Sequence, residues 1–480
     1  MRSAKSKGSA PGLPGGVLAT GFIVLTLVPL LAARLSGIDA VAPLHEFATA
    51  FGLMASALIL LQFWSSGRYE SLSGRIGLDR TMGFHRIAAY GLLLFALLHP
   101  LGYVASTFVS DPSAAWARLT GMLASPRLRS GVVALVGLCL LVALGAVRER
   151  IAWRYETWRA SHGLMAGAVA LTVLHHALTA GSYSREGLLY YFWITAATVA
   201  AIALLNVYAV RPWRMWRSRW EVESVAPLGL RTWGMTLIRK GPDRFDFRAG
   251  QFIWLTLAPN SPPFHDHPFS IASAPAELPR LKLIIREAGD CTNRFGETAP
   301  GTRVAVDGPH GSFFLDRTGK RVIMVAGGVG IAPLLGMLEE AASEGDGRFF
   351  HLLYAARKPD EFACMARLSE LQSHLNLSVR YLVDTDARAP EFIQGPVRPE
   401  HVNAALGPSP RDAIAYVCGP PRMMEDVTDA LLELGVPANA IHYERFDFGA
   451  GKGRLDRRRK RQAIAILLAL ALGAAVFSLS

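Results

Sequence analysis

Long apolar runs alternate with short charged loops over the first 210 residues of the chain. A membrane-spanning helix needs about 20 predominantly apolar residues, and about 17 is the lower limit. The pattern predicts six such spans, near Val17–Ala33, Leu44–Trp64, Phe84–Val104, Gly131–Val147, His162–Ala180 and Leu188–Val210. We expect the last helix to end at Arg211–Pro212, because proline cannot continue helical hydrogen bonding.

The pattern changes twice in the rest of the chain. From about Glu221 it is typical of short strands broken by glycine and proline, and from Arg321 of strands alternating with helices. A final apolar run, Ala463–Ser480, follows a basic cluster and predicts a carboxyl-terminal span, with a helix packed on the protein as the alternative. We therefore predict a multi-domain membrane protein: a six-helix transmembrane bundle (1–217), an antiparallel β-barrel domain (218–318), an α/β domain (319–449), and a basic linker with a transmembrane helix (450–480).

The loop charges predict the orientation of the spans. Cytoplasmic loops are enriched in Lys and Arg. These residues gather before the first span and after the second, fourth and sixth: Arg2, Lys5, Lys7; Arg68, Arg75, Arg80; Arg148, Arg150, Arg154; Arg211, Arg214, Arg217, Arg219. The amino terminus and the β and α/β domains are therefore expected in the cytoplasm, and Ser480 outside. A cleaved signal peptide is the alternative reading of the first span.

Composition narrows the class of protein. Hydrophobic residues make up 51% of the chain, which suits a protein that is part membrane and part soluble. The net charge of +12 follows largely from the inner loops and the basic tail, so we expect no nucleic-acid partner. The four cysteines are widely spread and form no CxxC, which argues against a disulfide framework and against a zinc or iron–sulfur site.

Two pairs of histidines lie inside the predicted spans. His85 and His99 are 14 residues apart, and His162 is followed at 13 and 14 residues by His175 and His176. Fourteen helical residues rise about 21 Å, so each pair places one imidazole near each side of a bilayer core. If the helices are neighbours, the predicted topology pairs His85 with His162, and His99 with His175 or His176.

Two stacked bis-histidine sites are how a protein would hold two haems to carry electrons across a membrane. A spacing of 14 returns close to the same helix face, so helix geometry favours His176 over His175, and both stay open. The alternative is that these are core histidines hydrogen-bonded between helices.

Four motifs in the soluble half suit nucleotide cofactors. His267-Pro268-Phe269-Ser270 offers an aromatic ring and a hydroxyl for a flavin, and the segment from Arg286 through Gly289 to Thr292 offers a turn for a pyrophosphate. Val322–Ala326 predicts a buried strand that enters a glycine loop, Gly327-Gly328-Val329-Gly330-Ile331-Ala332-Pro333, where backbone amides can approach a phosphate. Cys418-Gly419-Pro420 follows another buried strand, and Cys418 is either a residue against a nicotinamide or a buried small residue.

With these motifs in this order, the chain resembles the ferric reductase and NADPH oxidase superfamily, whose soluble half is a ferredoxin–NADP reductase-like module. The resemblance implies that His267 to Ser270 and Gly289 to Thr292 bind FAD, that Gly327 to Pro333 and Cys418 to Pro420 bind NAD(P)H, and that the helical domain holds two b-type haems. We expect Arg286 to contact a cofactor as well. Family modules often end with an aromatic residue that covers the flavin, and Phe446 or Phe448 occupies that place here. No family role transfers to the final apolar run, which we expect to tether the nucleotide domain at the bilayer.

The sequence thus predicts an NAD(P)H-dependent oxidoreductase of a bacterial inner membrane. Electrons would pass from cytoplasmic NADPH or NADH through FAD and two haems to an acceptor outside, and no catalytic general-base triad is expected. Ferric chelates, dioxygen and quinones are all compatible as acceptors. Two other classes remain open: a membrane-anchored flavin reductase without haem, and a haem-binding module that docks a partner.

Overall fold

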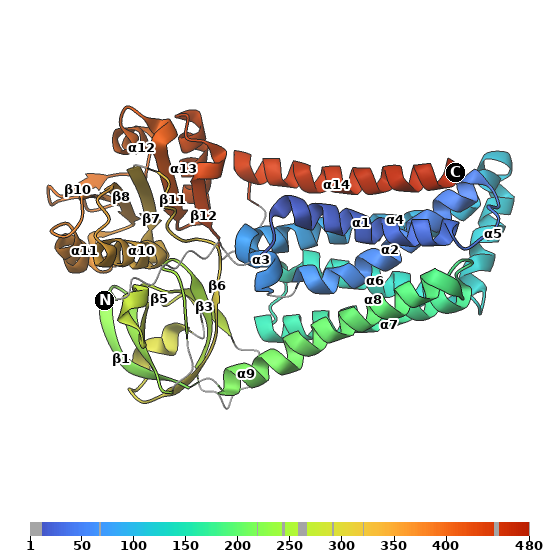
Figure 1. Cartoon of the computed structure of the whole chain (residues 1–480), viewed down its shortest axis with the longest axis horizontal. Helices are drawn as coiled ribbons and strands as arrows, with labels where there is room; N and C mark the ends of the chain where they lie inside the picture. Colours follow the sequence, from blue (N-terminus) through green and yellow to red (C-terminus); the bar gives the residue numbers. More distant parts are fainter. Residues whose placement is uncertain are drawn as a thin grey trace. The chain divides into compact units, whose positions relative to one another are not determined.

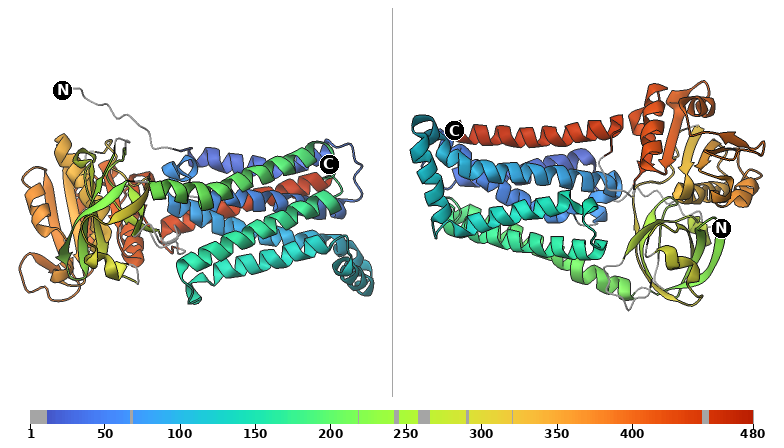
Figure 2. Two further views of the ribbon diagram at one scale, coloured as in Figure 1. Left: turned by 90° about the horizontal axis from the view of Figure 1, so that it is seen from below. Right: turned by 180° about the vertical axis from the view of Figure 1, so that it is seen from behind.

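The computed structural model describes residues 12–66, 69–217, 219–241, 245–257, 266–289, 292–319, 321–445 and 451–479. The chain forms two compact units. One comprises Ser73–Asp79 and Arg211–Arg459, and the other comprises Gly12–Leu72, Arg80–Val210 and Lys460–Ser480. Figures 1 and 2 show the helices and strands of each unit.

The helical unit is built from long apolar helices that run side by side in all views (Figures 1 and 2). Its main helices are α1 (Gly15–Arg34), α2 (Pro43–Ser66), α4 (Leu78–Ser110), α6 (Arg129–Ala146), α7 (Tyr155–Ala180), α8 (Gly187–Leu205) and most of α14 (Arg454–Leu479). Shorter helices are α3 (Glu70–Ile76), α5 (Pro112–Ala124) and α9 (Arg211–Arg217); α9 and the second half of α3 belong to the other unit.

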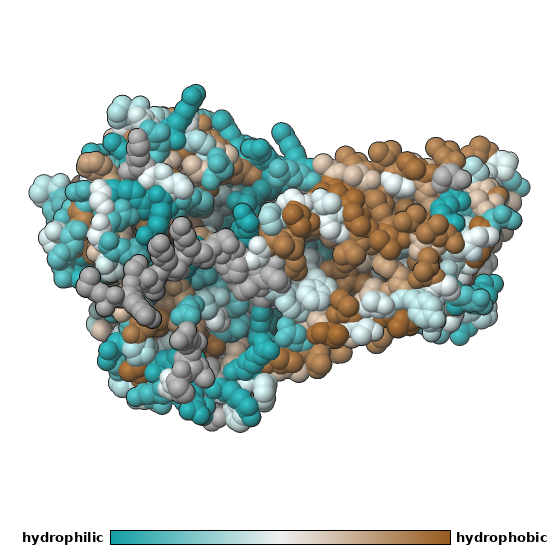
Figure 3. Space-filling model, in the orientation of Figure 1, coloured by the Kyte–Doolittle hydropathy of each residue, from teal (hydrophilic) through white to brown (hydrophobic). Residues whose placement is uncertain are grey.

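Seven helices of the described chain are long and apolar enough to cross a membrane, at the six predicted amino-terminal positions and in α14. In α2, 72% of the apolar window is buried inside the protein, against 28% or less in the other six. The exposed side chains on those six include Leu101, Val136, Leu171, Ile202 and Leu472. Figure 3 shows the corresponding apolar surface in brown. Apolar side chains at so many exposed positions suit a lipid environment.

Small residues allow the helices to approach closely. A Cβ on Gly91 of α4 would lie 2.6 Å from Leu467 of α14, and one on Gly473 of α14 would lie 2.6 Å from Leu27 of α1. Helices in membranes associate through such tight van der Waals contacts. The carboxyl-terminal apolar helix therefore packs against α1 and α4.

The sixth span continues past the predicted stop. A π-helical turn, Asn206–Val210, leads directly into α9, so the helix runs on through Pro212 to Arg217. Pro212 is the second residue after this π-helical turn, so the regular i→i−4 hydrogen-bond ladder is already interrupted just before the residue that lacks an N–H. The expected end at Arg211–Pro212 was wrong for this reason.

The first sheet is antiparallel, in the order β4-β3-β6-β1-β2-β5. Its strands are β1 (Trp220–Gly229), β2 (Thr232–Arg239), β3 (Phe252–Leu257), β4 (His267–Ser270), β5 (Arg280–Arg286) and β6 (Arg303–His310). The edge strands meet, because Ile271 bridges to Leu283 and the Ala272 N–H donates to the Lys282 carbonyl at 2.8 Å. Buried Leu237, Ile253, Leu281 and Phe295 are part of the core that this sheet encloses.

The second sheet is parallel, in the order β10-β9-β8-β7-β11-β12. Its strands are β7 (Arg321–Gly327), β8 (Phe349–Ala356), β9 (Leu377–Val383), β10 (Phe392–Gln394), β11 (Ala413–Cys418) and β12 (Ile441–Glu444), and its helices are α10 (Ile331–Glu344), α11 (Met365–Leu371), α12 (Pro399–Leu406) and α13 (Pro421–Glu433). Strands β7 and β11 are almost wholly buried, as expected of parallel strands covered on both faces. This sheet is the predicted α/β arrangement of alternating strands and helices.

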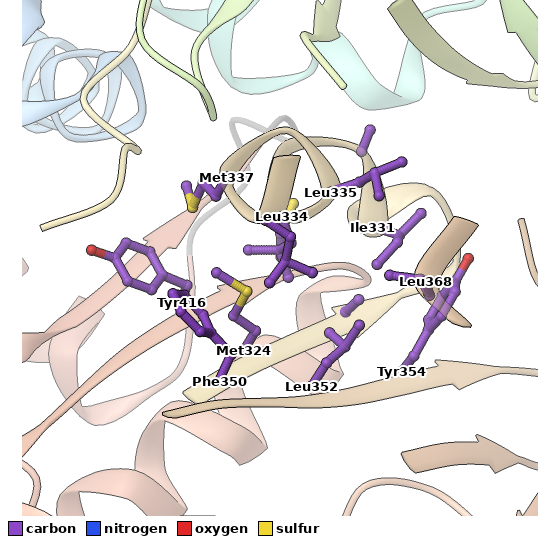
Figure 4. Close-up of a cluster of buried hydrophobic side chains, with 14 of the residues drawn as sticks. Met324, Ile331, Leu334, Leu335, Met337, Phe350, Leu352, Tyr354, Leu368 and Tyr416 are labelled. Carbon is purple, nitrogen blue, oxygen red and sulfur yellow. The ribbon is translucent and has the colours of Figure 1, made fainter. Parts of the chain in front are cut away.

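Separate apolar clusters cover the two faces of the parallel sheet. On one face, Leu334 of α10 points toward Met324 of β7 (Figure 4), and Phe350 and Tyr416 of the neighbouring strands belong to the same apolar cluster. On the other face, Val402 of α12 and Leu431 of α13 belong to one apolar cluster with Ile323 and Val325 of β7. Burial on both faces fixes the carboxyl edge of β7 and β11, where two predicted motifs lie.

Candidate functional site

One histidine pair joins α4 to α7 at the end of the helical unit where α4 begins. The imidazoles of His85 and His162 are close enough to interact electrostatically. Ser65 Oγ lies 3.1 Å from His85 Nδ1, and the Gln62 amide donates to the His85 carbonyl at 3.0 Å. The His162 ring stacks on Trp158 at 5.2 Å. Its Nδ1 is buried and has no hydrogen-bond partner within the described residues.

The second pair brings His99 and His176 together on the same two helices. These imidazoles also interact electrostatically. His99 Nδ1 donates to the Ala48 carbonyl at 2.8 Å, which leaves Nε2 of this neutral ring as its lone-pair nitrogen. Ser130 Oγ lies 3.2 Å from His176 Nδ1. An imidazole that is held through one nitrogen and free at the other is the usual form of a metal ligand.

Glycines face the rings of the second pair. A Cβ on Gly52 of α2 would lie 2.5 Å from His99 Cε1, and a Cβ on Gly131 of α6 would lie 2.6 Å from His176 Cε1. Both positions are therefore limited to glycine while the rings stay where they are. His175 takes a different direction and lines a groove with Arg127, Arg129 and Thr172.

The donor sets fit haem better than a bare metal ion. In the part of the chain that the structure describes, no three His, Cys, Asp or Glu side chains converge to hold an ion. Each pair supplies two imidazoles, and a six-coordinate iron would take its other four ligands from a porphyrin. The residues present thus suit two bis-histidine haems.

The predicted flavin residues lie along the antiparallel sheet and the loop after it. His267, Pro268, Phe269 and Ser270 form β4, where Ser270 is buried opposite Phe252 and the Phe269 ring lies 5.3 Å from Phe295. A hydroxyl and an aromatic ring are thereby fixed by strand pairing.

The loop after β5 closes on itself. Thr292 Oγ1 accepts from the Ala288 N–H at 2.8 Å and donates to the Gly289 carbonyl at 3.3 Å. Arg286, the last residue of β5, binds Glu361 at 3.3 Å. A Cβ on Gly328 would lie 3.5 Å from the Arg286 guanidinium, so this arginine reaches the predicted phosphate loop. Asp290, Cys291, Phe446 and Phe448 lie outside the described residues.

The two nucleotide motifs meet at the carboxyl edge of the parallel sheet. A Cβ on Gly330 would lie 2.2 Å from the Cys418 carbonyl oxygen, and one on Gly327 would lie 2.5 Å from Pro420 Cδ. Gly419 is as tight, with the Gly327 nitrogen 2.9 Å from its Cβ position. The loop leads into α10, whose first turn contains buried Pro333, and Gly328 adopts a φ of +54°. Backbone approaches this close require glycine at these positions.

A titratable pair adjoins that edge. Cys418 at the end of β11 is paired with Glu444 of β12. Burial raises the pKa of the Cys418 thiol, and the nearby Glu444 adds to the shift, so the thiol is neutral near pH 7. Burial and then the neighbouring Asp79 raise the pKa of Glu444 well above its ordinary value. Glu444 Oε2 is buried without a hydrogen-bond partner in the described chain.

The first turns of α14 dock on the nucleotide half through charges that the sequence did not reveal. Buried Arg445 lies between Glu425 of α13, at 3.4 Å, and Asp456 of α14, at 3.0 Å. Tyr443 donates to Asp456 at 2.7 Å, and Arg459 binds Asp79 at 3.2 Å. The corresponding signal in the sequence is the basic cluster from Arg454 onward, which by itself predicts only a charge that flanks a membrane span.

Models of known protein families match the chain in three successive segments. The family "Ferric reductase like transmembrane component" matches residues 51–174, "FAD-binding domain" matches residues 232–313, and "Oxidoreductase NAD-binding domain" matches residues 324–429. The fold and site therefore define a membrane oxidoreductase that uses a flavin and a pyridine nucleotide. The chain has the ferric reductase and NADPH oxidase-like architecture, which confirms the predicted resemblance, and it is an NAD(P)H-dependent oxidoreductase.

Three similar proteins each align with less than half of the chain. The sulfhydrogenase 1 gamma subunit of Pyrococcus furiosus is 28% identical over 219 residues, 44% of this chain and 73% of the relative. The phenol hydroxylase P5 protein of Acinetobacter pittii is 30% identical over 234 residues, 45% of this chain and 64% of the relative. The crystal structure of an Amycolatopsis cytochrome P450 reductase is 25% identical, with a TM-score of 0.43, and the match covers 48% of this chain and 69% of that one.

Proposed function

We propose that the chain passes electrons from cytoplasmic NAD(P)H, through FAD and two bis-histidine b-type haems, to an extracytoplasmic acceptor such as a ferric chelate or dioxygen. The observation that carries the proposal is the electrostatic pairing of His85 with His162 and of His99 with His176, each pair contributed by the apolar helices α4 and α7. When bound, FAD converts a two-electron hydride donor into single electrons, and haem iron carries them one at a time.

The residues of the chain would bind the cofactors and orient them. Ser65, Ser130 and the Ala48 carbonyl fix the three rings whose Nδ1 atoms they contact. We propose His85, His99, His162 and His176 as the ligands, with His175 outside the coordination sphere. On the soluble side, we propose that His267 to Ser270, Arg286, Gly289 and Thr292 hold FAD, and that Phe446 or Phe448 covers it. The loop Gly327 to Pro333 and the turn Cys418 to Pro420 would hold the nucleotide.

The proposed arrangement keeps the four predicted segments, 1–217, 218–318, 319–449 and 450–480. We infer that the first six spans form one bundle and that the antiparallel sheet is a barrel, which the contact between its edge strands supports. We infer a bacterial inner membrane, and the loop charges support a cytoplasmic position of the FAD and NAD(P) domains.

The test uses the full chain, purified in detergent, and two neighbouring variants. A low-spin b-type spectrum at about two haems per chain, reduced by NADPH without oxygen, is expected for the wild type. His176→Ala should lose about half of the haem, whereas His175→Ala should keep both haems. If the protein contains no haem but NADPH still reduces its flavin, the chain is a membrane-anchored flavin reductase. Haem without nucleotide-driven flavin reduction would indicate a partner-docking module.

A further inference from the structure

A groove lies between two of the long apolar helices of the helical unit. It is formed by the start of α6, with the loop before it, and by the carboxyl-terminal half of α7. Its volume is about 470 Å³, within the range of about 300–1,000 Å³ that is typical of sites for small molecules. Both helices are long and apolar enough to cross a membrane, so the groove opens toward lipid.

The two ends of the groove differ in chemistry. Arg127 and Arg129 stand where α6 begins, and both side chains are exposed. Val133 lines the groove about 6 Å further along α6, and Thr172 lines it about 10 Å along α7 from Thr179. The groove therefore has guanidiniums at one end and largely apolar walls beyond them.

The apolar wall continues along both helices beyond the groove. On α6, Val133, Val136 and Leu140 are spaced by three and four residues, so they share one helix face, and each is more than half exposed. On α7, Leu164 and Leu171 are exposed and seven residues apart, which is about two turns. Exposed apolar stripes thus lead from the charged end of the groove toward the middle of the helices.

The charged end of the groove favours an anion. No carboxylate is found among the described side chains that line it, and the first turn of α6 contains no acidic residue. Two guanidiniums so close in sequence repel each other, and a phosphate between them would remove that repulsion. Arginine is well suited to phosphate, and basic pockets between membrane helices are typical sites for phospholipid headgroups.

We propose that this groove binds an anionic phospholipid, with its phosphate at Arg127 and Arg129 and an acyl chain along Val133 and the exposed stripes beyond it. The apolar walls favour a lipid over a free anion, which would leave them without a partner. Ser130 lines the groove, and its hydroxyl lies 3.2 Å from His176 Nδ1, so the lipid would lie one side chain away from that ring. The proposal requires neither haem nor electron transfer.

The chain supplies matched controls for both ends of the groove. Arg129→Gln is compared with Arg118→Gln, because Arg118 of α5 is also exposed, donates to Thr107 at 3.1 Å and does not line the groove. Val133→Trp, which fills the apolar part, is compared with Val24→Trp of α1. The two valines are 55% and 53% exposed.

The measurement is the binding of phosphatidylglycerol and phosphatidylcholine to each full-length protein in detergent, by native mass spectrometry. Arg129→Gln should weaken phosphatidylglycerol binding by about fivefold, because a charge-assisted contact is lost. Val133→Trp should weaken it by about fivefold as well, because the indole occupies the space of the acyl chain. Both control variants should stay within about twofold of the wild type.

Three outcomes would overturn the proposal. The first is wild-type affinity for phosphatidylglycerol in both groove variants, and the second is equal affinity of the wild type for the two lipids. The third is displacement of bound phosphatidylglycerol by glycerol 3-phosphate or inorganic phosphate at equal concentration, which would assign the groove to a small free anion. The unfolding temperature of each variant shows whether a loss of binding comes from the groove or from misfolding, and the two groove variants change different ends of it.

Discussion

Gly330 is the residue on which the contact between the two nucleotide motifs depends most directly. Gly330→Ala would place a methyl group 2.2 Å from the Cys418 carbonyl, so one of the two loops must move. We expect a loss of about 1–3 kcal/mol in stability and a raised KM for NAD(P)H. Thermal unfolding and steady-state kinetics measure the two effects.

The matched control for this prediction is Gly347→Ala. Nothing lies within 4 Å of a Cβ at Gly347, and its φ is not in the left-handed region. This variant should keep the unfolding temperature and the KM of the wild type. If Gly330→Ala behaves in the same way, the two loops are not packed as described.

The buried carboxyl of Glu444 should make the free energy of unfolding depend on pH. Its folded pKa lies above the ordinary value, so folding takes up a proton once the pH exceeds about 4.3, the unfolded value. The stability due to this carboxyl is complete below that pH and falls as the pH rises toward the folded pKa, by up to about 1.4 kcal/mol per pH unit. Glu444→Gln cannot titrate and should lack this fall.

The measurement is the unfolding temperature of both proteins between pH 4 and pH 8. The difference between Glu444→Gln and the wild type should grow in favour of the variant as the pH rises. Glu433→Gln, at a half-exposed residue of α13, corrects for the loss of a surface charge. Parallel curves for Glu444→Gln and the wild type would contradict a buried, proton-binding carboxyl.

The sequence indicated which motifs lie at the carboxyl edge of the parallel sheet, but it did not indicate which side chains contact the histidine rings. Gly327, Gly330 and Cys418 to Pro420 meet as expected, because the carboxyl ends of adjacent parallel strands share one edge. The contacts of Ser65 and Ser130 with imidazoles depend on the rotation of separate helices. Periodicity along one helix does not determine that rotation, so these partners were not predictable.

At the scale of elements, hydropathy located the spans but underestimated their lengths. The third span was expected near Phe84–Val104, and α4 runs from Leu78 to Ser110. Its ends are polar, and a hydropathy pattern sees only the apolar centre of a helix. The turn at Asn206–Val210 was hidden for a related reason, since a π-helical turn leaves no signature in composition.

The start of α14 gives a prediction at this scale. Arg445 is buried between the carboxylates of Glu425 and Asp456, so Arg445→Met leaves two negative charges without their shared partner. Because both carboxylates keep some contact with solvent, we expect the free energy of unfolding to fall by about 2–4 kcal/mol. This is somewhat less than the loss on breaking a fully buried ion pair. Thermal unfolding, followed by tryptophan fluorescence and flavin release, measures the loss.

Arg454→Met is the control for that prediction. Arg454 and Glu433 form an ion pair in which both side chains are about half exposed. Exposed pairs contribute less than about 1 kcal/mol, so this variant should unfold close to the wild type. Equal effects of the two variants would mean that the docking of α14 does not depend on Arg445.

At the scale of the whole molecule, the two units have different chemistry. The helical unit contains the paired imidazoles. The sheet unit contains the flavin motifs on its antiparallel sheet and the nucleotide motifs on its parallel sheet. The sequence predicted this division because lipid and water demand opposite surface patterns. Its charges also predicted that helices α4 and α7 run in the same direction, which the observed histidine pairs require.

This division yields the prediction that a variant in one unit separates the two halves of the reaction. His99→Ala removes one ligand of the second pair, and haem affinity at that site should fall by at least about 100-fold. Flavin reduction by NADPH should keep the wild-type rate, because its proposed residues all lie in the sheet unit. Anaerobic stopped-flow absorbance at the flavin band, beside steady-state reduction of ferric citrate, should show the first step intact and the second lost. His175→Ala also removes an imidazole, one residue from His176, and this control should retain the second step. Full ferric citrate reduction by His99→Ala would place the electron path elsewhere.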